Sequence, residues 1–216
     1  MQDDPEIKIS EIFYSLQGET SFVGLPTVFV RLTGCPLRCN YCDTAYAFSG
    51  GKRSTVKSIL NTVQSYSPRY VTVTGGEPLA QPACLVLLQR LCDLGYTVSL
   101  ETSGAINIEG VDQRVTTIMD LKTPSSRESE RNLYANLNYL KPTDQVKFVI
   151  ADKSDFDWAK EIIEEYRIVD RAHVLFSPSH GVLENEILAD WIVEGNLPVR
   201  FQVQLHKYIW DEDRGR

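Results

Sequence analysis

The sequence predicts an α/β protein in which parallel strands form a partial, open β/α barrel within one domain. Short runs rich in β-branched residues recur along the chain, and stretches of helical length separate many of them. Alternation of this kind favours a parallel sheet with helical crossovers. A complete eight-stranded barrel typically needs about 250 residues, whereas this chain has 216. We therefore expect an incomplete barrel.

The predicted strands share one composition. Each is short, is enriched in β-branched or aromatic residues, and ends near glycine, proline or a charged residue. Because the carboxyl ends of parallel strands gather at one face, we expect the chemistry of this protein at that face. The strands are predicted at residues 27–33, 70–74, 97–101, 117–121, 146–150, 173–176 and 200–203.

Helices are predicted between several of these strands. Ser54 and Ser154 are placed to cap two of them, because a hydroxyl oxygen accepts hydrogen bonds from amide groups that a helix start leaves unpaired. The polar run 125–131 is predicted to be an exposed loop, and no repeat or linker divides the chain. The predicted helices span residues 55–66, 83–94, 155–166 and 184–194.

The composition argues against two classes of partner. The chain carries 22 Lys and Arg against 29 Asp and Glu, a net charge of −7, so it offers no broad basic surface to nucleic acid. No apolar run approaches the roughly 20 residues that a membrane-spanning helix requires. The acidic start, residues 1–6, lacks the features of a secretory or transit peptide, which predicts a cytoplasmic protein.

Three cysteines crowd into one loop. Cys35, Cys39 and Cys42 follow the strand predicted at 27–33, with three and then two residues between them. In a chain of this size, such neighbours suit a metal in a reducing compartment better than a disulfide framework. Soft thiolates are typical ligands of iron–sulfur clusters. Three cysteines would leave one iron of a 4Fe-4S cluster open to a small molecule with amine and carboxylate groups.

Structural zinc is the alternative that spacing alone leaves open. Zinc prefers four ligands. Cys84 and Cys92 fall on the helix predicted at 83–94, among leucines, where a buried cysteine behaves as a small hydrophobe. Core packing is therefore the role predicted for these two cysteines. A zinc site on the cysteine loop would have to recruit a distant residue from among His173, His180, His206, Cys84 and Cys92.

The cysteine loop resembles the signature of the radical S-adenosylmethionine superfamily, which has these spacings and an aromatic residue, here Tyr41, before the third cysteine. The segment 74–78, Thr-Gly-Gly-Glu-Pro, is similar to the glycine-rich segment that receives the methionine amino group in that superfamily. Glycine lets a backbone approach a ligand closely, although glycine and proline also dominate ordinary turns. The resemblance implies a partial barrel of the radical S-adenosylmethionine type, a 4Fe-4S cluster on Cys35, Cys39 and Cys42, and S-adenosylmethionine as cofactor.

A narrower resemblance covers nearly the whole chain. The segment 15–20, Ser-Leu-Gln-Gly-Glu-Thr, precedes Phe-Val-Arg-Leu at 29–32, an arrangement that looks like 7-carboxy-7-deazaguanine synthases. Each later matching segment is weak alone, and their order carries the resemblance. These segments are 101–104, 120–122, 146–149 and 204–208.

This family resemblance implies a reaction and a domain plan. The reaction is conversion of 6-carboxy-5,6,7,8-tetrahydropterin to 7-carboxy-7-deazaguanine with loss of ammonia, a radical ring contraction in 7-deazapurine and queuosine biosynthesis. S-adenosylmethionine would be cleaved to start the reaction and regenerated at its end. The plan is one domain over 1–216, with an N-terminal substrate-binding segment at 1–26 and a C-terminal extension at 200–216.

Site residues follow from the same resemblance. Arg31 would face the substrate carboxylate, because a guanidinium forms paired charge-assisted hydrogen bonds. Thr44 would bind magnesium, a cation that prefers oxygen ligands. The remaining substrate contacts implied are Leu16, Gln17, Gly18, Glu19 and Thr74. The implied S-adenosylmethionine contacts are Tyr41, Cys42, Asp43, Gly76, Glu101, Asp120, Lys122, Ser177, Pro178, Ser179 and His180.

Several of these residues also have an ordinary interpretation. Arg31 alone is compatible with a surface arginine, and Glu101 or Lys122 with an exposed ion pair at a strand end. Asp43 and Thr44 are residue types that cap local turns. The segment 177–180 departs from the Gln-Pro form expected in many relatives, and the tail lacks the terminal proline seen in some. A solvated surface is predicted at least as readily as a function for Lys147, His206 and Lys207.

Two further classes of function remain to be compared. A radical-generating activase of glycyl-radical enzymes combines the same cysteine signature with a partial barrel, but the segments 16–19 and 204–207 argue against it. A zinc- or cluster-binding interaction module would need no cofactor pocket. The partners implied for the synthase are the pterin substrate, an electron donor such as flavodoxin or ferredoxin, and a second copy in a homodimer.

Overall fold

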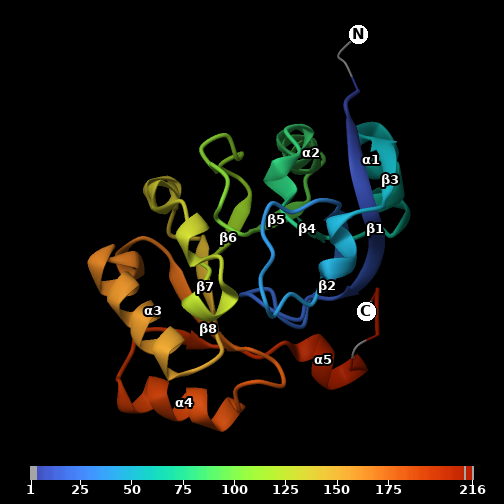
Figure 1. Cartoon of the computed structure of the whole chain (residues 1–216). Helices are drawn as coiled ribbons and strands as arrows, with labels where there is room; N and C mark the ends of the chain where they lie inside the picture. The colour runs from blue at the N-terminus through green and yellow to red at the C-terminus, as the bar shows by residue number, and fades with distance from the viewer. Residues whose placement is uncertain (1–3, 212, 216) are drawn as a thin grey trace.

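Across residues 4–211 and 213–215, the part of the chain that the computed structural model describes, nine strands form one sheet in the order β3-β1-β2-β4-β5-β6-β7-β8-β9. Neighbouring strands from β2 to β9 are parallel. The sheet curves but does not close, which confirms the predicted open barrel (Figure 1). The strands are β1 (Glu6–Leu16), β2 (Pro26–Leu32), β3 (Lys52–Thr55), β4 (Tyr70–Gly75), β5 (Thr97–Thr102), β6 (Thr116–Asp120), β7 (Gln145–Ile150), β8 (His173–Pro178) and β9 (Arg200–Phe201).

The helices that connect parallel strands lie on the outer side of the curved sheet (Figure 1). Their positions agree with the sequence prediction to within two residues, but two of the caps differ. Thr55, not Ser54, accepts from the Ser58 amide, because Thr55 is the residue with extended backbone at the helix start. Asp152, not Ser154, caps the helix that begins at Lys153, and Ser154 lies inside the first turn of that helix. The helices are α1 (Val56–Ser65), α2 (Ala83–Asp93), α3 (Lys153–Glu165) and α4 (Asn185–Glu194).

The segment before residue 26 contains a strand that the sequence did not predict. β1 pairs antiparallel with both β2 and β3, so it extends the sheet beyond the repeated strand–helix units. The loop that follows, residues 17–25, then crosses the barrel from the start of β2 to the start of β7. The Ser21 amide donates to Gln145 Oε1 at 3.0 Å, and Gln202 Nε2 donates to the Thr20 carbonyl at 3.1 Å. These contacts tie the N-terminal part of the chain to β7 and to the segment after β9.

The apolar core falls into two clusters. One lies between β1, β2, β4 and β5 and the helices α1 and α2, and it contains Cys84 and Cys92 at 0% and 9% exposure. This burial confirms the packing role predicted for both cysteines. The other cluster lies between β6, β7 and β8 and the helices α3 and α4, around Phe148 and Phe176. β5 and β6 pair along the boundary between the two clusters.

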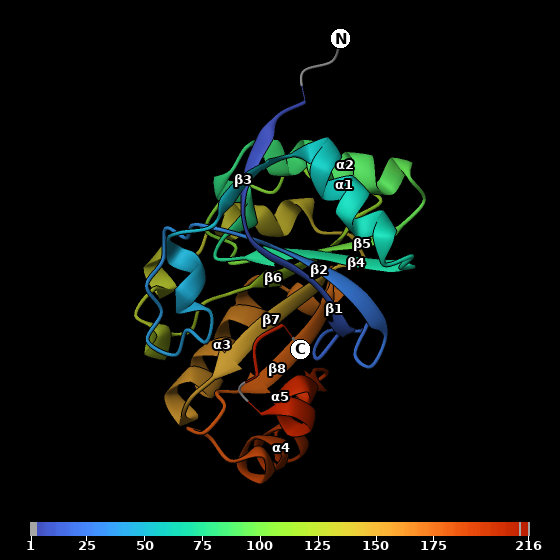
Figure 2. The ribbon, with the colours of Figure 1, turned by 90° about the vertical axis from the view of Figure 1, so that its right-hand side faces the viewer.

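Two local predictions are corrected, and one helix is added to those predicted. The run 125–131 is not simply an exposed loop: it lies in the turns η3 (Pro124–Ser126) and η4 (Ser129–Arg131). Ser126 is fully buried, and its hydroxyl donates to the Thr123 carbonyl. β9 is shorter than predicted, because Gln202 already leaves the strand. A short helix that was not predicted, α5 (Leu205–Trp210), follows it and lies beside α4 (Figure 2). None of the described helices is both long and apolar enough to cross a membrane.

Candidate active site

A cavity of about 380 Å³ opens at the carboxyl ends of the parallel strands. The cysteine loop, the N-terminal loop after β1 and the C-terminal segment complete its walls. Every site residue implied by the sequence resemblance lines this one cavity. Those residues are Leu16, Gln17, Gly18, Glu19, Arg31, Cys35, Cys39, Tyr41, Cys42, Asp43, Thr44, Thr74, Gly76, Glu101, Asp120, Lys122, Ser177, Pro178, Ser179 and His180.

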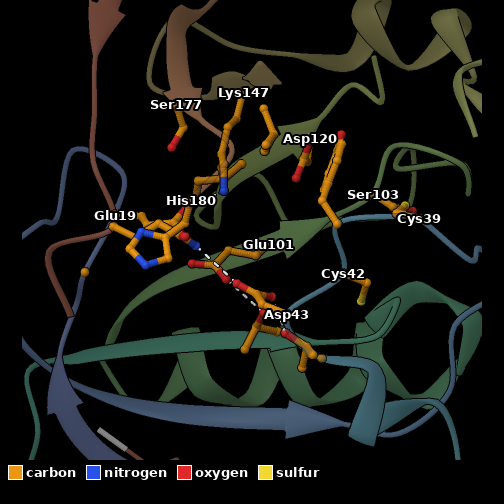
Figure 3. Close-up of a pocket in the computed structure, with 18 of the residues that line it drawn as sticks. Glu19, Cys39, Cys42, Asp43, Glu101, Ser103, Asp120, Lys147, Ser177 and His180 are labelled. Atoms are coloured by element: carbon orange, nitrogen blue, oxygen red, sulfur yellow. Dashed lines mark hydrogen bonds and ion pairs between the residues drawn. The ribbon is translucent and has the colours of Figure 1, made fainter. Parts of the chain in front are cut away.

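Backbone contacts position the cysteine loop. The Gly34 amide donates to the Ala47 carbonyl at 2.8 Å, and the Asn40 amide donates to the Ser126 carbonyl at 3.2 Å. Cys39 and Cys42 lie along one side of the cavity, with Glu19 and His180 on the other (Figure 3). Within the described ranges, no three His, Cys, Asp or Glu side chains converge on one ion position.

The thiols need a cation to ionise. Burial raises the pKa of all three cysteines, with that of Cys39 reaching about 11. The Lys122 ammonium acts in the opposite direction but does not outweigh the loss of hydration. Bound metal deprotonates a coordinating thiol outright. The loop is therefore a set of soft ligands that reaches its thiolate form when iron binds.

Glycine brings the next loop against the cysteine loop. A Cβ atom at Gly76 would lie 2.3 Å from the Gly34 carbonyl oxygen and 2.7 Å from Cys35 Cβ, so no side chain fits there. Glu77 follows and is fully buried. Its carboxylate accepts from the Ser103 amide at 2.7 Å and from the Thr102 hydroxyl at 2.9 Å, which joins this loop to the end of β5. The segment 74–78 is thus a fixed wall of the cavity and not merely a turn.

The floor of the cavity contains a hydrogen-bonded carboxylate. Thr74 Oγ1 donates to Glu101 Oε2 at 2.8 Å, and Gln17 Nε2 donates to Glu101 Oε1 at 3.1 Å. Burial and the nearby Glu19 carboxylate raise the pKa of Glu101. No ion pair joins Glu101 to any described Lys or Arg, so the exposed pair considered for this residue is not found.

Lys147 is a floor residue and not part of the solvated surface. Its ammonium bonds directly to the Glu19 carboxylate, and their side chains are 13% and 14% exposed. Burial alone would raise the pKa of Glu19, but the Lys147 charge and the hydrogen bonds from Lys147 and Gln204 together lower that pKa. For the same reason the pKa of Lys147 lies above its ordinary value despite burial. The pair fixes the N-terminal loop to β7 before any ligand is bound.

A second ion pair stands near Cys39. Lys122 Nζ lies 2.9 Å from Asp120 Oδ2, and both side chains are largely buried, at 13% and 20% exposure. The other oxygen, Asp120 Oδ1, is buried without a hydrogen-bond partner among the described residues. A buried acceptor without a partner is costly. A ligand carrying hydroxyl or amine donors would satisfy it from the cavity.

Arg31 lines the cavity beside the aromatic rings of Phe13 and Tyr46. Its Nε donates to Glu11 Oε1 at 2.8 Å, and its Cζ lies 5.7 Å from the centre of the Phe13 ring. Phe13 stacks on Phe29 with ring centres 4.9 Å apart, and both rings line the cavity. A side chain 17% exposed and paired with a carboxylate is not an ordinary surface arginine.

Comparison with known proteins decides the family. The sequence profile of the Radical SAM superfamily matches residues 29–187. A 7-carboxy-7-deazaguanine synthase from Chlorobaculum tepidum is 44% identical, over 99% of this chain and 98% of the relative. Another from Koribacter versatilis is 41% identical, over 94% of this chain and 97% of the relative. The chain belongs to the 7-carboxy-7-deazaguanine synthase family.

The fold agrees with this family. The crystal structure of QueE from Escherichia coli is similar with a TM-score of 0.78, at 22% identity over 93% of this chain and 95% of that one. As a Radical SAM enzyme of the 7-carboxy-7-deazaguanine synthase family, the protein uses a 4Fe-4S cluster and S-adenosylmethionine. The residues present fit both groups: three half-buried thiols share one wall, and the unpartnered Asp120 oxygen lies beside them.

The wall of the synthase-family cavity that α5 forms was not predicted from the sequence. In α5, the Leu205 amide donates to the Gly18 carbonyl at 2.9 Å, and a Cβ atom at Gly18 would lie 2.1 Å from His206 Nδ1. Gln204 Nε2 donates to Glu19 Oε1 at 2.8 Å and to Asp43 Oδ2 at 3.2 Å. His206 and Lys207, which had no predicted role, therefore line the cavity because α5 packs on the N-terminal loop.

Asp43 and Thr44 lie where α5 meets the cysteine loop. Thr44 Oγ1 donates to Asp43 Oδ1 at 2.8 Å, as a local capping contact would. Burial opposes ionisation of Asp43, but hydrogen bonds from Thr44 and Gln204 and the Lys207 charge lower its pKa to about 2. Other cavity residues that sequence reasoning missed are Phe13, Phe29 and Ser103. Phe29 and Ser103 lie within the matching segments 29–32 and 101–104, which could have indicated them, whereas Phe13 lies outside every matching segment.

Proposed function

We propose that this protein converts 6-carboxy-5,6,7,8-tetrahydropterin to 7-carboxy-7-deazaguanine with loss of ammonia, in 7-deazapurine and queuosine biosynthesis. The observation that carries the proposal is the single cavity, in which a three-cysteine wall faces a floor built from Gln17, Thr74 and Glu101. Bound there, the cluster and S-adenosylmethionine supply the radical that removes hydrogen from the substrate. Near full-length relatives that are 7-carboxy-7-deazaguanine synthases favour this reaction over a glycyl-radical activase or a binding module.

The residues that line the cavity fall into two sets with different ligands, and the two sets meet at Glu101. Asp120, Lys122 and the segments 41–43 and 177–180 bind S-adenosylmethionine, together with Gly76 and Glu101. Leu16, Gln17, Gly18, Glu19, Arg31 and Thr74 bind the pterin. The cavity has a volume of about 380 Å³, and His206 and Lys207 of α5 form part of its wall.

Arg31 and Thr44 have the most specific polar roles. Arg31 binds the substrate carboxylate, since its guanidinium already lines the cavity. Thr44 contributes an oxygen to magnesium, which would replace its present contact with Asp43. The N-terminal segment 1–26 carries the pterin contacts other than Arg31 and Thr74, and the C-terminal extension 200–216 packs on Gly18 and Glu19. Residues 1–3 of the first segment and residues 212 and 216 of the second lie outside the described residues.

The partners proposed follow from the reaction. Reduction of the cluster requires an electron donor, for which flavodoxin or ferredoxin is suitable, and iron–sulfur chemistry suits the cytoplasm. We propose a homodimer on the basis of the family resemblance, and no direct contact with nucleic acid or membrane, on the net charge of −7 and the apolar run lengths.

The decisive experiment is anaerobic incubation of reconstituted, reduced protein with S-adenosylmethionine and 6-carboxytetrahydropterin, followed by mass spectrometry. We expect 7-carboxy-7-deazaguanine. Formation of 5'-deoxyadenosine without that product would keep the radical class but reject the substrate. Neither compound, from protein with a verified cluster, would reject the proposed reaction altogether.

A further inference from the structure

Two residues outside the predicted set hold Arg31 in place. Glu11 Oε1 accepts from Arg31 Nε at 2.8 Å, and the Tyr46 hydroxyl donates to that same oxygen at 2.7 Å. The Arg31 and Glu11 side chains are 17% and 24% exposed, so solvent screens the pair only in part. One carboxylate oxygen thus receives two donors, from β2 and from the turn η1 (Ala45–Phe48).

A β-bulge brings Glu11 to this position. In β1, Ile9 lies opposite Leu32, and the register then shifts so that Glu11 lies opposite Arg31. Without the shift, Ser10 would face Arg31, and Glu11 would face Val30, which is fully buried in the core. A bulge re-aims a side chain because successive strand residues point to opposite faces. The irregularity therefore moves the carboxylate from the core face to the cavity face.

The contacts of Arg31 leave one edge of its guanidinium available. Glu11 takes the Nε edge, and the rings of Phe13 and Tyr46 lie 5.7 Å and 5.9 Å from Arg31 Cζ. Among the described residues, neither terminal nitrogen of Arg31 forms a hydrogen bond or an ion pair. Those nitrogens form the edge that binds a carboxylate through two parallel hydrogen bonds.

We propose that Glu11 and Tyr46 are positioning residues that hold Arg31 so that its terminal nitrogens meet the carboxylate of the substrate. The inference rests on the proposed function. Glu11 also neutralises the charge of Arg31 locally. Preference for a carboxylated ligand over an uncarboxylated one therefore depends on the geometry of the hydrogen bonds more than on net charge attraction. Fixing a long side chain in advance removes an ordering cost that binding would otherwise carry.

Binding of two unreactive ligands tests the proposal without turnover. Reconstituted protein with S-adenosylmethionine, but no reductant, is titrated with 6-carboxypterin and with pterin, and their fluorescence gives two dissociation constants. The ratio of the constants is the carboxylate preference. Arg31→Ala should abolish this preference. Glu11→Ala should lower it roughly tenfold, the effect of losing a hydrogen bond to a charged group, with pterin binding unchanged.

Tyr46→Phe separates position from charge, because it removes one hydrogen bond and alters no charge. It should lower the preference roughly threefold. The matched control is Glu6→Ala in the same strand, which breaks an exposed pair with Arg53 at 3.5 Å and should leave the preference unchanged. An unchanged or higher preference in Glu11→Ala, or equal weakening of both ligands, would overturn the inference alone. Wild-type protein without any carboxylate preference would overturn it together with the substrate assignment.

Discussion

The cysteine wall and the floor of the cavity differ in how many of their polar groups have partners before any ligand binds. On the cysteine wall, Cys35, Cys39 and Cys42 are half-buried thiols whose pKa values are raised by burial. On the floor, Glu19 is already paired with Lys147, and Glu101 already accepts hydrogen bonds from neighbouring side chains. The cysteine wall therefore lacks the cation that would stabilise its thiolates, whereas on the floor Glu19 already has its cation, Lys147.

This difference predicts two kinds of response to substitution. Removing a thiol deletes one of three attachment points that only metal completes, so the loss should be all or none. Removing a floor residue unbalances a network that exists in the folded protein, so the loss should be graded and visible in stability as well as activity. The predictions below test that division.

The largest effect is expected at the cysteine wall. Replacing Cys35, Cys39 or Cys42 with alanine should abolish cleavage of S-adenosylmethionine, because an incomplete thiolate set loses or misplaces the cluster. Iron content, visible absorbance and 5'-deoxyadenosine release measure this. Cys92→Ala is the matched control, because Cys92 packs in the core away from the loop and should keep its cluster. Full activity in any of the three loop variants would defeat the cluster assignment.

The next effect is expected on the floor. Lys147→Met leaves the Glu19 carboxylate buried without its cation, which should lower the free energy of unfolding by about 3 kcal/mol in urea titrations. Arg53→Met, which breaks an exposed pair with Glu6, should cost less than about 1 kcal/mol. Equal losses in the two variants would mean that the floor is not prebuilt in the way the structure shows.

A pH dependence is expected from Glu101. Its pKa in the folded state lies above the ordinary value of 4.5, so protonated Glu101 favours folding at low pH and this contribution is lost as pH rises through the folded pKa. Glu101→Gln keeps an uncharged acceptor there. Its stability relative to wild type should therefore increase as pH rises above about 4.5 and then level off.

Chemical unfolding of both proteins from about pH 4 to about pH 8 checks this prediction. Glu161→Gln, on the exposed face of α3, supplies the baseline for removing a surface carboxylate. A relative stability of Glu101→Gln that falls with rising pH would show that ionised Glu101 is stabilised in the folded protein, contrary to the prediction.

The smallest effect is expected at Gln204, where the cysteine wall meets the floor. Gln204 bridges Glu19 on the floor side and Asp43 on the cysteine side. Gln204→Leu should raise 5'-deoxyadenosine release per product about threefold, because one bridging amide is lost while both walls remain. Gln202→Leu removes a contact to the same N-terminal loop but none to Asp43. A similar rise in both variants would indicate loop anchoring in place of coupling between the walls.

Sequence reasoning predicted the parallel strands well because their patterns are local. β4 and β7 are short segments rich in β-branched residues, and the structure gives them within one residue of the prediction. β1 was missed because the bulge after Ile9 interrupts its alternation. The caps moved by one or two residues because Thr55 and Asp152 stand beside Ser54 and Ser154, and only backbone geometry selects between such neighbours.

The site could be predicted as a set of segments but not as a set of contacts. Matching motifs identified residues that do line one cavity, while their individual roles stay predictions. Burial of Lys147 depends on Glu19, 128 positions earlier in the chain, and no local pattern indicates such a pair. Glu11 and Tyr46 likewise become part of the site only through their contact with Arg31.

Because the apolar core is divided where β5 meets β6, the protein should open in two cooperative units during native-state hydrogen exchange. The cavity takes Arg31 and Thr74 from one unit, and Lys147 and Ser177 from the other. A ligand that contacts both units stabilises each of them against opening. Saturation with substrate and cofactor should therefore slow amide exchange in both units together, by an amount that grows with ligand concentration.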